Sequence, residues 1–185
     1  LYFPEKYGLS VAAINYTLAT PSTPSFPVAV DDIILAAEFF KSNHGVNKIH
    51  VVGSSAGANL AALAVIARPD LFTSFVGYYG AYDLTKTSEF NVDVQAAINQ
   101  FTTDKAASSP TLQAGVFNIP AYLVTGDADT VVNMQQTIDF ATALGITPDV
   151  VNGEIHGFKL FGESGALNMP DFAKRVYSFF DKVGE

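Results

Sequence analysis

The sequence predicts an α/β fold, with a mostly parallel β-sheet covered by helices on both faces. Short apolar runs rich in β-branched residues alternate along the chain with longer stretches of helical period, which is the pattern of strands connected by helices. The 185 residues and the apolar content of 49% suit one domain with a buried core. We therefore expect a single domain over residues 1–185, with a small insertion around residues 83–118.

The first half of the chain is expected to hold two strands and two helices. Residues 10–16 and residues 48–53 are the predicted strands, and the second is of the buried type. A helix is predicted over residues 27–43, because apolar side chains recur there at helical spacing and Gly45 is placed to end it. The Ala- and Leu-rich stretch over residues 54–68 is predicted to turn sharply out of the second strand into the second helix.

The second half continues the alternation of strands and helices. Within the insertion, residues 92–101 place apolar side chains three to four apart, so one short amphipathic helix is expected over the sheet edge, as a candidate wall of a pocket. Further strands are predicted over residues 73–79, 119–125 and 147–151, and further helices over residues 134–144 and 169–183, the last with Asn168 as its cap.

Composition argues against several classes of partner. The net charge of −8, from 10 basic and 18 acidic residues, repels phosphate backbones and anionic lipid heads, so no nucleic-acid partner is expected. No apolar run approaches the roughly 20 residues of a membrane span, and none is predicted. The absence of cysteine excludes disulfides, a thiol nucleophile and thiolate metal sites. It leaves the compartment open, with the cytosol favoured by a small margin, and the oligomeric state is not indicated.

A serine nucleophile is predicted at Ser55. The segment Gly53-Ser54-Ser55-Ala56-Gly57 matches the G-x-S-x-G motif and lies between a predicted strand and a predicted helix, the context which that motif requires. Small residues on both sides let the strand and the helix approach closely around the serine. The N–H of Ala56, at the helix start, can donate to the oxyanion that forms on a substrate. The alternative is a small-residue turn that only packs a helix on a strand, or a phosphate-binding loop.

Such a serine needs a histidine to accept its proton and a carboxylate to orient that histidine, and after this motif the chain order is Ser, acid, His. Residues 126–132 follow a predicted strand and carry two acids, Asp127 and Asp129. Asp129 is the favoured candidate. Asp127 remains an alternative, as does Asp83, which follows the strand over residues 73–79. Asp127 or Asp129 could instead serve only to cap the helix that begins near Asn133.

His156 is the predicted base. It lies in residues 153–158, after the last predicted strand, and the carboxyl ends of strands in open α/β sheets are where ligand sites lie. His44 is at a predicted helix end, and His50 lies inside a strand, short of its carboxyl end, so neither suits the role. The alternative for His156 is an exposed loop residue without function.

Together these residues resemble the bacterial esterase/lipase group of α/β-hydrolases that includes hormone-sensitive-lipase-like and feruloyl-esterase-like enzymes. The resemblance spans nearly the whole chain, although Thr17 stands where Arg is common and Ala58 where Gly is frequent. The matching positions are Gly53, Ser55, Ala56, Gly57 and Asn59 of the serine motif, Gly126, Asp129 and Val132 of the acid loop, His156, Gly157 and Phe158 of the base loop, and residues 15–19 and 26–32 upstream. The acid-loop match is the reason for preferring Asp129 over Asp127.

The resemblance also implies an H-G-G-G loop that supplies further oxyanion donors, and this sequence contains no such tetrapeptide. In the group, that loop follows a strand lying between the strands that match residues 10–16 and 48–53. We expect residues upstream of Leu1 to supply this strand, since the match continues to the start of the chain and the chain opens without Met. The alternative is that residues 10–16 pair directly with residues 48–53.

The resulting functional prediction is a serine carboxylic-ester hydrolase that forms an acyl-enzyme through Ser55, His156 and Asp129, with Ala56 as oxyanion donor. The short insertion is too small for a large lipase lid, so the expected partner is a small or medium acyl or aryl ester. No cofactor and no metal are expected. The alternatives are a non-catalytic or weakly active hydrolase-fold fragment without its oxyanion loop, and a peptidase or thioesterase on the same fold.

Overall fold

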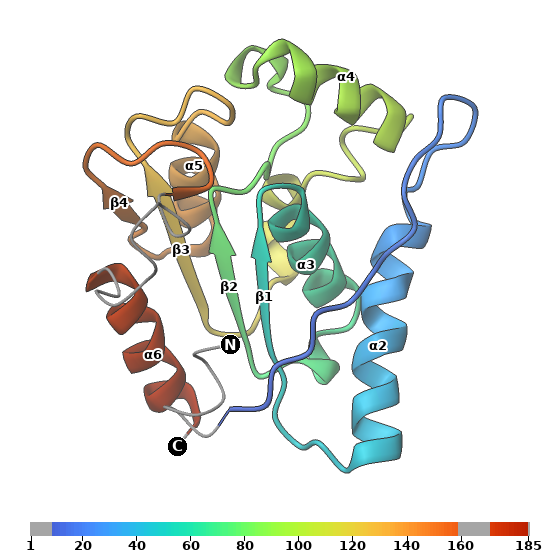
Figure 1. The fold of residues 1–185 in the computed structure, drawn as a ribbon, viewed down its shortest axis with the longest axis vertical. Coiled ribbons are helices and arrows are strands. Elements are labelled where there is room, and N and C mark those ends of the chain that lie inside the picture. Colours follow the sequence, from blue (N-terminus) through green and yellow to red (C-terminus); the bar gives the residue numbers. More distant parts are fainter. Residues whose placement is uncertain (1–8, 159–170, 185) are drawn as a thin grey trace.

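The computed structural model describes residues 9–158 and 171–184. At its centre is a four-stranded sheet in the order β1-β2-β3-β4, and all three neighbouring pairs are parallel (Figure 1). The strands are β1 (His50–Ser54), β2 (Ser74–Tyr78), β3 (Ala121–Gly126) and β4 (Asp149–Val151). Because all four run in one direction, their carboxyl ends meet at one edge of the sheet, where the loops with the predicted site residues begin.

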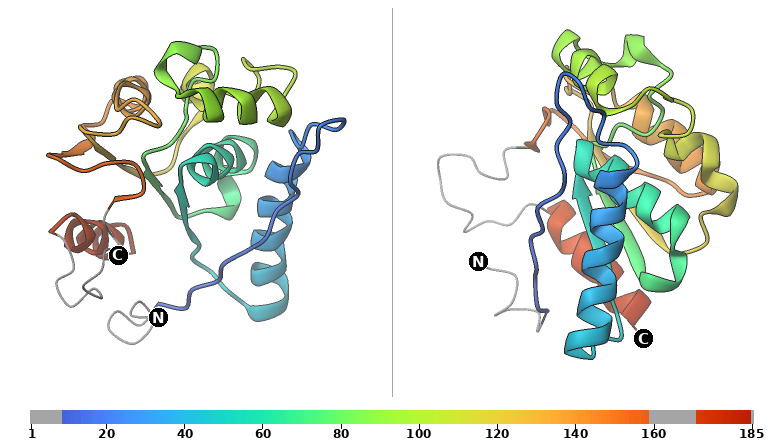
Figure 2. Two further views of the ribbon diagram at one scale, coloured as in Figure 1. Left: turned by 45° about the horizontal axis from the view of Figure 1, so that its top comes forward. Right: turned by 90° about the vertical axis from the view of Figure 1, so that its right-hand side faces the viewer.

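Helices cover both faces of the sheet, as the sequence predicts (Figure 2). On one face α3 (Ala56–Ala67) packs against β1 and β2, and α5 (Gln135–Leu144) packs against β3. On the other face α6 (Asp171–Gly184) packs against β2 and β3. Neighbouring residues of β2 face opposite sides of the sheet. Phe75 packs in the cluster around α3, whereas Val76 packs in the cluster around α6.

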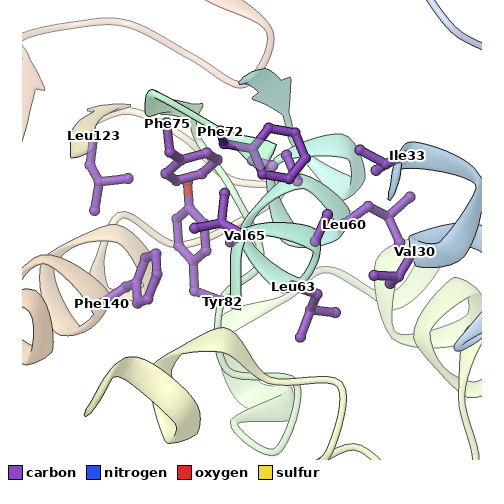
Figure 3. Close-up of a cluster of buried hydrophobic side chains, with 14 of the residues drawn as sticks. Val30, Ile33, Leu60, Leu63, Val65, Phe72, Phe75, Tyr82, Leu123 and Phe140 are labelled. Atoms are coloured by element: carbon purple, nitrogen blue, oxygen red, sulfur yellow. The ribbon is translucent and has the colours of Figure 1, made fainter. Parts of the chain in front are cut away.

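The main core forms around α3, which is apolar on nearly every side. Its Ala-rich surface lets α2 (Val28–His44) pack on its outer side while the sheet packs on its inner side. Large side chains from other elements fill the remaining space, and Tyr82 stacks on Phe140 with 4.6 Å between ring centroids (Figure 3). Gly45 ends α2 in the left-handed conformation, at φ 63°, which glycine adopts without steric cost.

The first part of the insertion lies above the carboxyl ends of β1 and β2 (Figure 1), whereas its end packs against α3 and α5. It contains the short turns η2 (Thr87–Glu89) and η3 (Pro110–Val116), with α4 (Val92–Phe101) between them at the predicted bounds. Asn91 starts α4, because its side chain accepts a hydrogen bond from the N–H of Val94 at 2.9 Å. The insertion therefore borders the edge of the sheet at which ligands bind in this fold class.

The prediction of a strand over residues 10–16 is wrong. Residues 9–19 have no regular secondary structure, and Val11 and Leu18 are 56% and 73% exposed. Within the described residues β1 pairs with β2 alone, so the direct pairing of residues 10–16 with this strand does not occur. An apolar β-branched pattern forms a strand only where a neighbour completes its hydrogen bonds, and the pattern itself does not provide one.

The remaining elements agree with their predicted ranges to within a few residues. The closing helix α6 begins at Asp171 in the structure, and its predicted cap, Asn168, lies outside the described residues. No helix in the described part of the chain has both the length and the apolar character to cross a bilayer.

Candidate active site

Ser55 occupies a strained turn between β1 and α3. Its backbone has φ 51° and ψ −121°, a conformation that residues with a side chain rarely adopt. The strand and the helix approach so closely that a Cβ on Gly53 would lie 2.3 Å from the carbonyl oxygen of Gly57. The N–H of Ser55 donates to the carbonyl of Tyr78 at 2.9 Å, which holds the turn against β2. A side chain does not fit at position 53, so the motif needs a glycine there.

His156 lies beside this serine, in the loop that follows β4. Its Nε2 is 3.0 Å from Ser55 Oγ, and its side chain is 18% exposed. The loop turns back through Gly153 and Gly157, which have φ values of 75° and 86°. A distance of 3.0 Å is within the reach required for proton transfer between a serine and a histidine.

Asp129 completes a hydrogen-bonded row with His156 and Ser55. Its Oδ2 is 2.7 Å from His156 Nδ1, and its side chain has no exposed surface. Its Oδ1 accepts hydrogen bonds from the N–H groups of Val131 and Val132, at 2.8 and 2.9 Å. Both oxygens of this buried carboxylate therefore have partners, and the geometry fixes the side of Asp129 that faces the imidazole.

The alternative acids have other partners. Asp127 is exposed, and its Oδ1 accepts the N–H of Gly153 at 2.6 Å. Asp83 is buried, and its Oδ1 accepts hydrogen bonds from the backbone N–H and the hydroxyl of Thr85, at 3.0 and 2.5 Å. Of the three candidates, Asp129 is the one that the structure brings to the histidine.

The other histidines lie away from this row. His44 is exposed at the end of α2. His50 lies at the beginning of β1, where its Nδ1 is 2.7 Å from Ser74 Oγ. Burial lowers the pKa of His50, and the positive charge of Lys48 acts in the same direction. These placements agree with the reasons for leaving both residues out of the predicted site.

Ala56 is the first residue of α3 and is exposed. The N–H groups in the first turn of a helix have no acceptor within the helix, and the helix dipole favours a negative charge there. The N–H of Ala56 therefore lies directly after Ser55, at a helix start where a negative charge is favoured.

Sequence reasoning assigned no role to three buried residues around the site. Asn59 donates through Nδ2 to the carbonyls of Ala81 and Ser108, at 2.7 and 3.0 Å, and joins the insertion to α3. Gln136 accepts the N–H groups of Tyr82 and Asp83 and donates to Glu89, and so joins the insertion to α5. Tyr79 contacts the imidazole of His156. The motif match at Asn59 was the one sequence signal among them.

The described residues contain no group of three or more His, Asp and Glu side chains that could hold a metal ion. A row of Ser, His and Asp side chains such as the one around Ser55 can transfer a proton through its hydrogen bonds. Such a row is suited to acyl transfer, in which a hydroxyl attacks a carbonyl and an imidazole moves the proton.

Comparison with known proteins shows the fold and the family. No curated protein matches the chain significantly. The solved structure of the carboxylesterase Cest-2923 from Lactobacillus plantarum WCFS1 is similar with a TM-score of 0.73, at 18% identity, over 92% of this chain and 73% of its own. A puromycin-hydrolyzing peptidase from Mycobacterium tuberculosis is similar with a TM-score of 0.60, at 26% identity, over 71% of this chain.

The chain matches only 22% of the length of that peptidase, so it corresponds to one part of the larger protein. The family comparison covers more of this chain. The model of the prolyl oligopeptidase family matches residues 27–183, a range that includes Ser55, Asp129 and His156. A match over most of the chain, together with the parallel sheet and helices on both faces, identifies the superfamily as the α/β-hydrolases. The chain belongs to the prolyl oligopeptidase family.

Proposed function

We propose that this protein is a serine hydrolase that cleaves carboxylic esters through an acyl-enzyme. One observation carries the proposal: Asp129, His156 and Ser55 form a continuous row with separations of 2.7 and 3.0 Å. Three loops from different strands, far apart in the sequence, bring these side chains together at the carboxyl edge of the sheet. A purely structural role does not require this order of donor and acceptor atoms.

In the proposed reaction Ser55 Oγ attacks the carbonyl carbon of the ester while His156 Nε2 takes the serine proton. Asp129 Oδ2 accepts the hydrogen bond of His156 Nδ1–H and stabilises the imidazolium that forms. The N–H of Ala56 donates to the oxyanion of the tetrahedral intermediate. His156 then gives its proton to the departing alcohol, and water, activated by the same imidazole, releases the acid and restores the serine.

An ester of small or medium size is the proposed substrate class. An alkoxide or phenolate leaves a tetrahedral intermediate more easily than an amine does, so ester cleavage needs less stabilisation of the oxyanion. One oxyanion donor typically contributes about 2.7 to 4 kcal/mol, and Ala56 is the donor identified here. The insertion adds a single short helix above the site, which leaves little surface for a long acyl chain.

A peptidase is the second candidate, and the family match is the observation that favours it. A peptide-like amide would react through the same atoms, with His156 protonating the departing amine. The two candidates differ in the stabilisation that the oxyanion and the leaving group need. Parallel assays with a p-nitrophenyl ester and the matching aminoacyl p-nitroanilide therefore distinguish them.

The test begins with an active-site-directed fluorophosphonate and p-nitrophenyl acetate. We expect the wild-type protein to be labelled and to hydrolyse the ester, and the Ser55→Ala variant to lose labelling entirely. In the Ser55→Ala and His156→Ala variants, kcat should fall by about 10⁶-fold. A folded wild-type protein that is neither labelled nor active would contradict the proposal and favour the non-catalytic alternative. Faster cleavage of the anilide than of the ester would favour the peptidase.

A further inference from the structure

Tyr79 packs against the imidazole of the proposed base and directly follows β2. Its ring is 4.7 Å from the imidazole of His156 between centroids, at an interplanar angle of 63°. The same ring meets Phe158 at 4.9 Å and 89°. Tyr79 is 7% exposed, so the two contacts form within the packed interior of the site. Edge-to-face pairs at such distances are the favoured arrangement of aromatic rings.

Residues 78 and 79 also connect the strands that lead to the other two members of the row. The carbonyl of Tyr78 accepts the N–H of Ser55 at 2.9 Å, and the N–H of Tyr79 donates to the carbonyl of Val124 at 2.7 Å. The side chain of Ser54, directly before Ser55, is hydrogen-bonded to the hydroxyl of Tyr79. This one residue therefore touches the serine turn, the strand before the acid loop, and the histidine.

The backbone of Tyr79 has φ 39°, in the region that bulky residues rarely adopt. A strained conformation persists only where the surrounding structure holds it, and here it aims a large ring at the imidazole. Burial raises the pKa of Tyr79, so its hydroxyl stays neutral over the pH range in which esterases are assayed.

We propose that Tyr79 is a positioning residue, whose ring holds the imidazole of His156 at the angle and distance needed to reach Ser55 Oγ. Asp129 lies at Nδ1 and Ser55 at Nε2, but hydrogen bonds at these two atoms leave the plane of the ring free to tilt about the line between them. The ring of Tyr79 removes this freedom because it packs against the imidazole, and Phe158 packs against Tyr79 in turn. The inference rests on the proposed function, because it concerns the base of that reaction.

The test compares three substitutions in the full chain, with kcat and KM measured separately on p-nitrophenyl acetate. Tyr79→Leu removes the ring and should lower kcat by on the order of 10²-fold, the usual effect of a misplacement of about 1 Å, while KM changes by less than about twofold. Tyr79→Phe keeps the ring and should retain kcat to within roughly tenfold, the effect of one lost hydrogen bond. Tyr79→Asn also lacks the ring, but Asn adopts positive φ readily. It should lose kcat as Tyr79→Leu does, which would assign the loss to the missing ring rather than to backbone strain.

Phe75→Leu is the matched control, since Phe75 is a buried aromatic of β2, the strand that Tyr79 directly follows, on the face toward α3. It should lower the unfolding temperature about as much as Tyr79→Leu and leave kcat near the wild-type value. The proposal is overturned if Tyr79→Leu keeps kcat within about threefold, if Phe75→Leu loses kcat equally, or if Tyr79→Phe is no better than Tyr79→Leu. Failure of both ring-less variants to fold would assign Tyr79 to stability and overturn it too.

The wild-type protein separates this inference from the proposed function. If the wild type hydrolyses the ester and loses labelling on Ser55→Ala, the function holds, and the Tyr79 variants decide the positioning role alone. A wild type that is inactive and unlabelled would remove both proposals together.

Discussion

Two loops at the same edge of the sheet hold the acid and the histidine of the site in different ways. The acid loop, residues 126–132, is fixed largely by its backbone. Phe90 and Val132 form an antiparallel bridge, which ties the acid loop to the insertion. The N–H groups of Val131 and Val132 hold one oxygen of Asp129 and leave the other toward the histidine.

The base loop, residues 152–158, has a backbone hydrogen bond from the N–H of Ala128 to the carbonyl of Glu154 at 3.1 Å, and it depends in addition on side-chain packing and glycine conformations. Gly153 and Gly157 turn it at positive φ, and Phe158, at φ 42°, anchors it through the ring of Tyr79. Ile155, next to the histidine, is 50% exposed. The comparison teaches that the acid is held by backbone N–H groups, which survive most substitutions of nearby side chains, whereas the histidine depends in addition on the packing of a few particular side chains. The following predictions, from the largest effect to the smallest, test this difference.

The largest effect is expected from Asp129→Asn. Because the N–H groups of Val131 and Val132 need an acceptor, the amide oxygen should take their side and turn the NH₂ group toward His156 Nδ1. Two donors would then face each other unless the imidazole adopts the wrong tautomer. We expect kcat to fall by up to roughly 10⁴-fold with little change in unfolding temperature. An Asp129→Asn variant with near wild-type activity would show that the carboxylate of Asp129 is not the orienting acid.

The next prediction compares substitutions of one glycine in the acid loop and one glycine in the base loop. A Cβ on Gly126 would lie 2.1 Å from the carbonyl oxygen of Glu154, so Gly126→Ala should cost about 1 to 3 kcal/mol of unfolding free energy and displace the base loop. Gly157 has open space but φ 86°, so Gly157→Ala should cost about 1 to 2 kcal/mol through backbone strain.

Asn substitution distinguishes the two causes, because Asn tolerates positive φ better than Ala does. Gly157→Asn should recover part of the stability lost in Gly157→Ala, whereas Gly126→Asn should be no better than Gly126→Ala. Denaturant unfolding of the four variants measures this, and equal recovery at both positions would contradict the assignment.

A smaller effect is expected from the link between the loops. Asp127→Ala removes the acceptor for the N–H of Gly153, a bond of 2.6 Å at an exposed position where water can replace it. We expect kcat/KM to fall by roughly twofold to tenfold, the effect of about 1 kcal/mol. Asp127→Asn keeps an acceptor oxygen and should stay near the wild-type value. A dead Asp127→Asn beside an active Asp129→Asn would transfer the orienting role to Asp127.

The smallest effect concerns pH and a histidine outside both loops. Burial lowers the pKa of His50 below its ordinary value of 6.5, so the unfolded chain takes up a proton there before the folded chain does. Stability should therefore be unaffected by His50 above about pH 6.5 and decrease as the pH falls from there toward the lowered pKa. Because His50 is partly exposed, the loss should be small.

His50→Gln cannot titrate and is the control for that prediction. The difference in unfolding free energy between the wild type and this variant should change between pH 7 and pH 5, with the wild type losing more. A constant difference over this range would show that His50 does not contribute to the pH dependence.

The positions that local sequence determines were predictable. The strands from β1 to β4 were recovered because each is a short apolar run before a turn signal, and α4 was recovered at its bounds because its apolar residues recur with helical period. Ser55 was predicted because its motif encodes a local turn. The strain at φ 51° and the contact between residues 53 and 57 both involve residues close together in the chain.

Long-range contacts were not predictable in the same way. Tyr79 meets a histidine that lies 77 residues further along the chain, 156 − 79, and its own apolar strand gives no sign of that contact. The buried Gln136 reads as an ordinary polar helix residue, although it joins the insertion to α5. Residues 10–16 have the composition of a strand, but composition cannot supply the neighbour that a strand needs.

The two acids of residues 126–132 show most directly what each level decides. By itself the sequence determined that a carboxylate would follow β3 and a histidine would follow β4, because the alternation of strands and helices places both loops at one edge. Asp127 and Asp129 carry the same side chain two positions apart. Only the tertiary structure directs Asp129 to the imidazole and Asp127 to Gly153, since the bridge from Phe90 to Val132 and the pairing of β3 with β4 set how the loop turns.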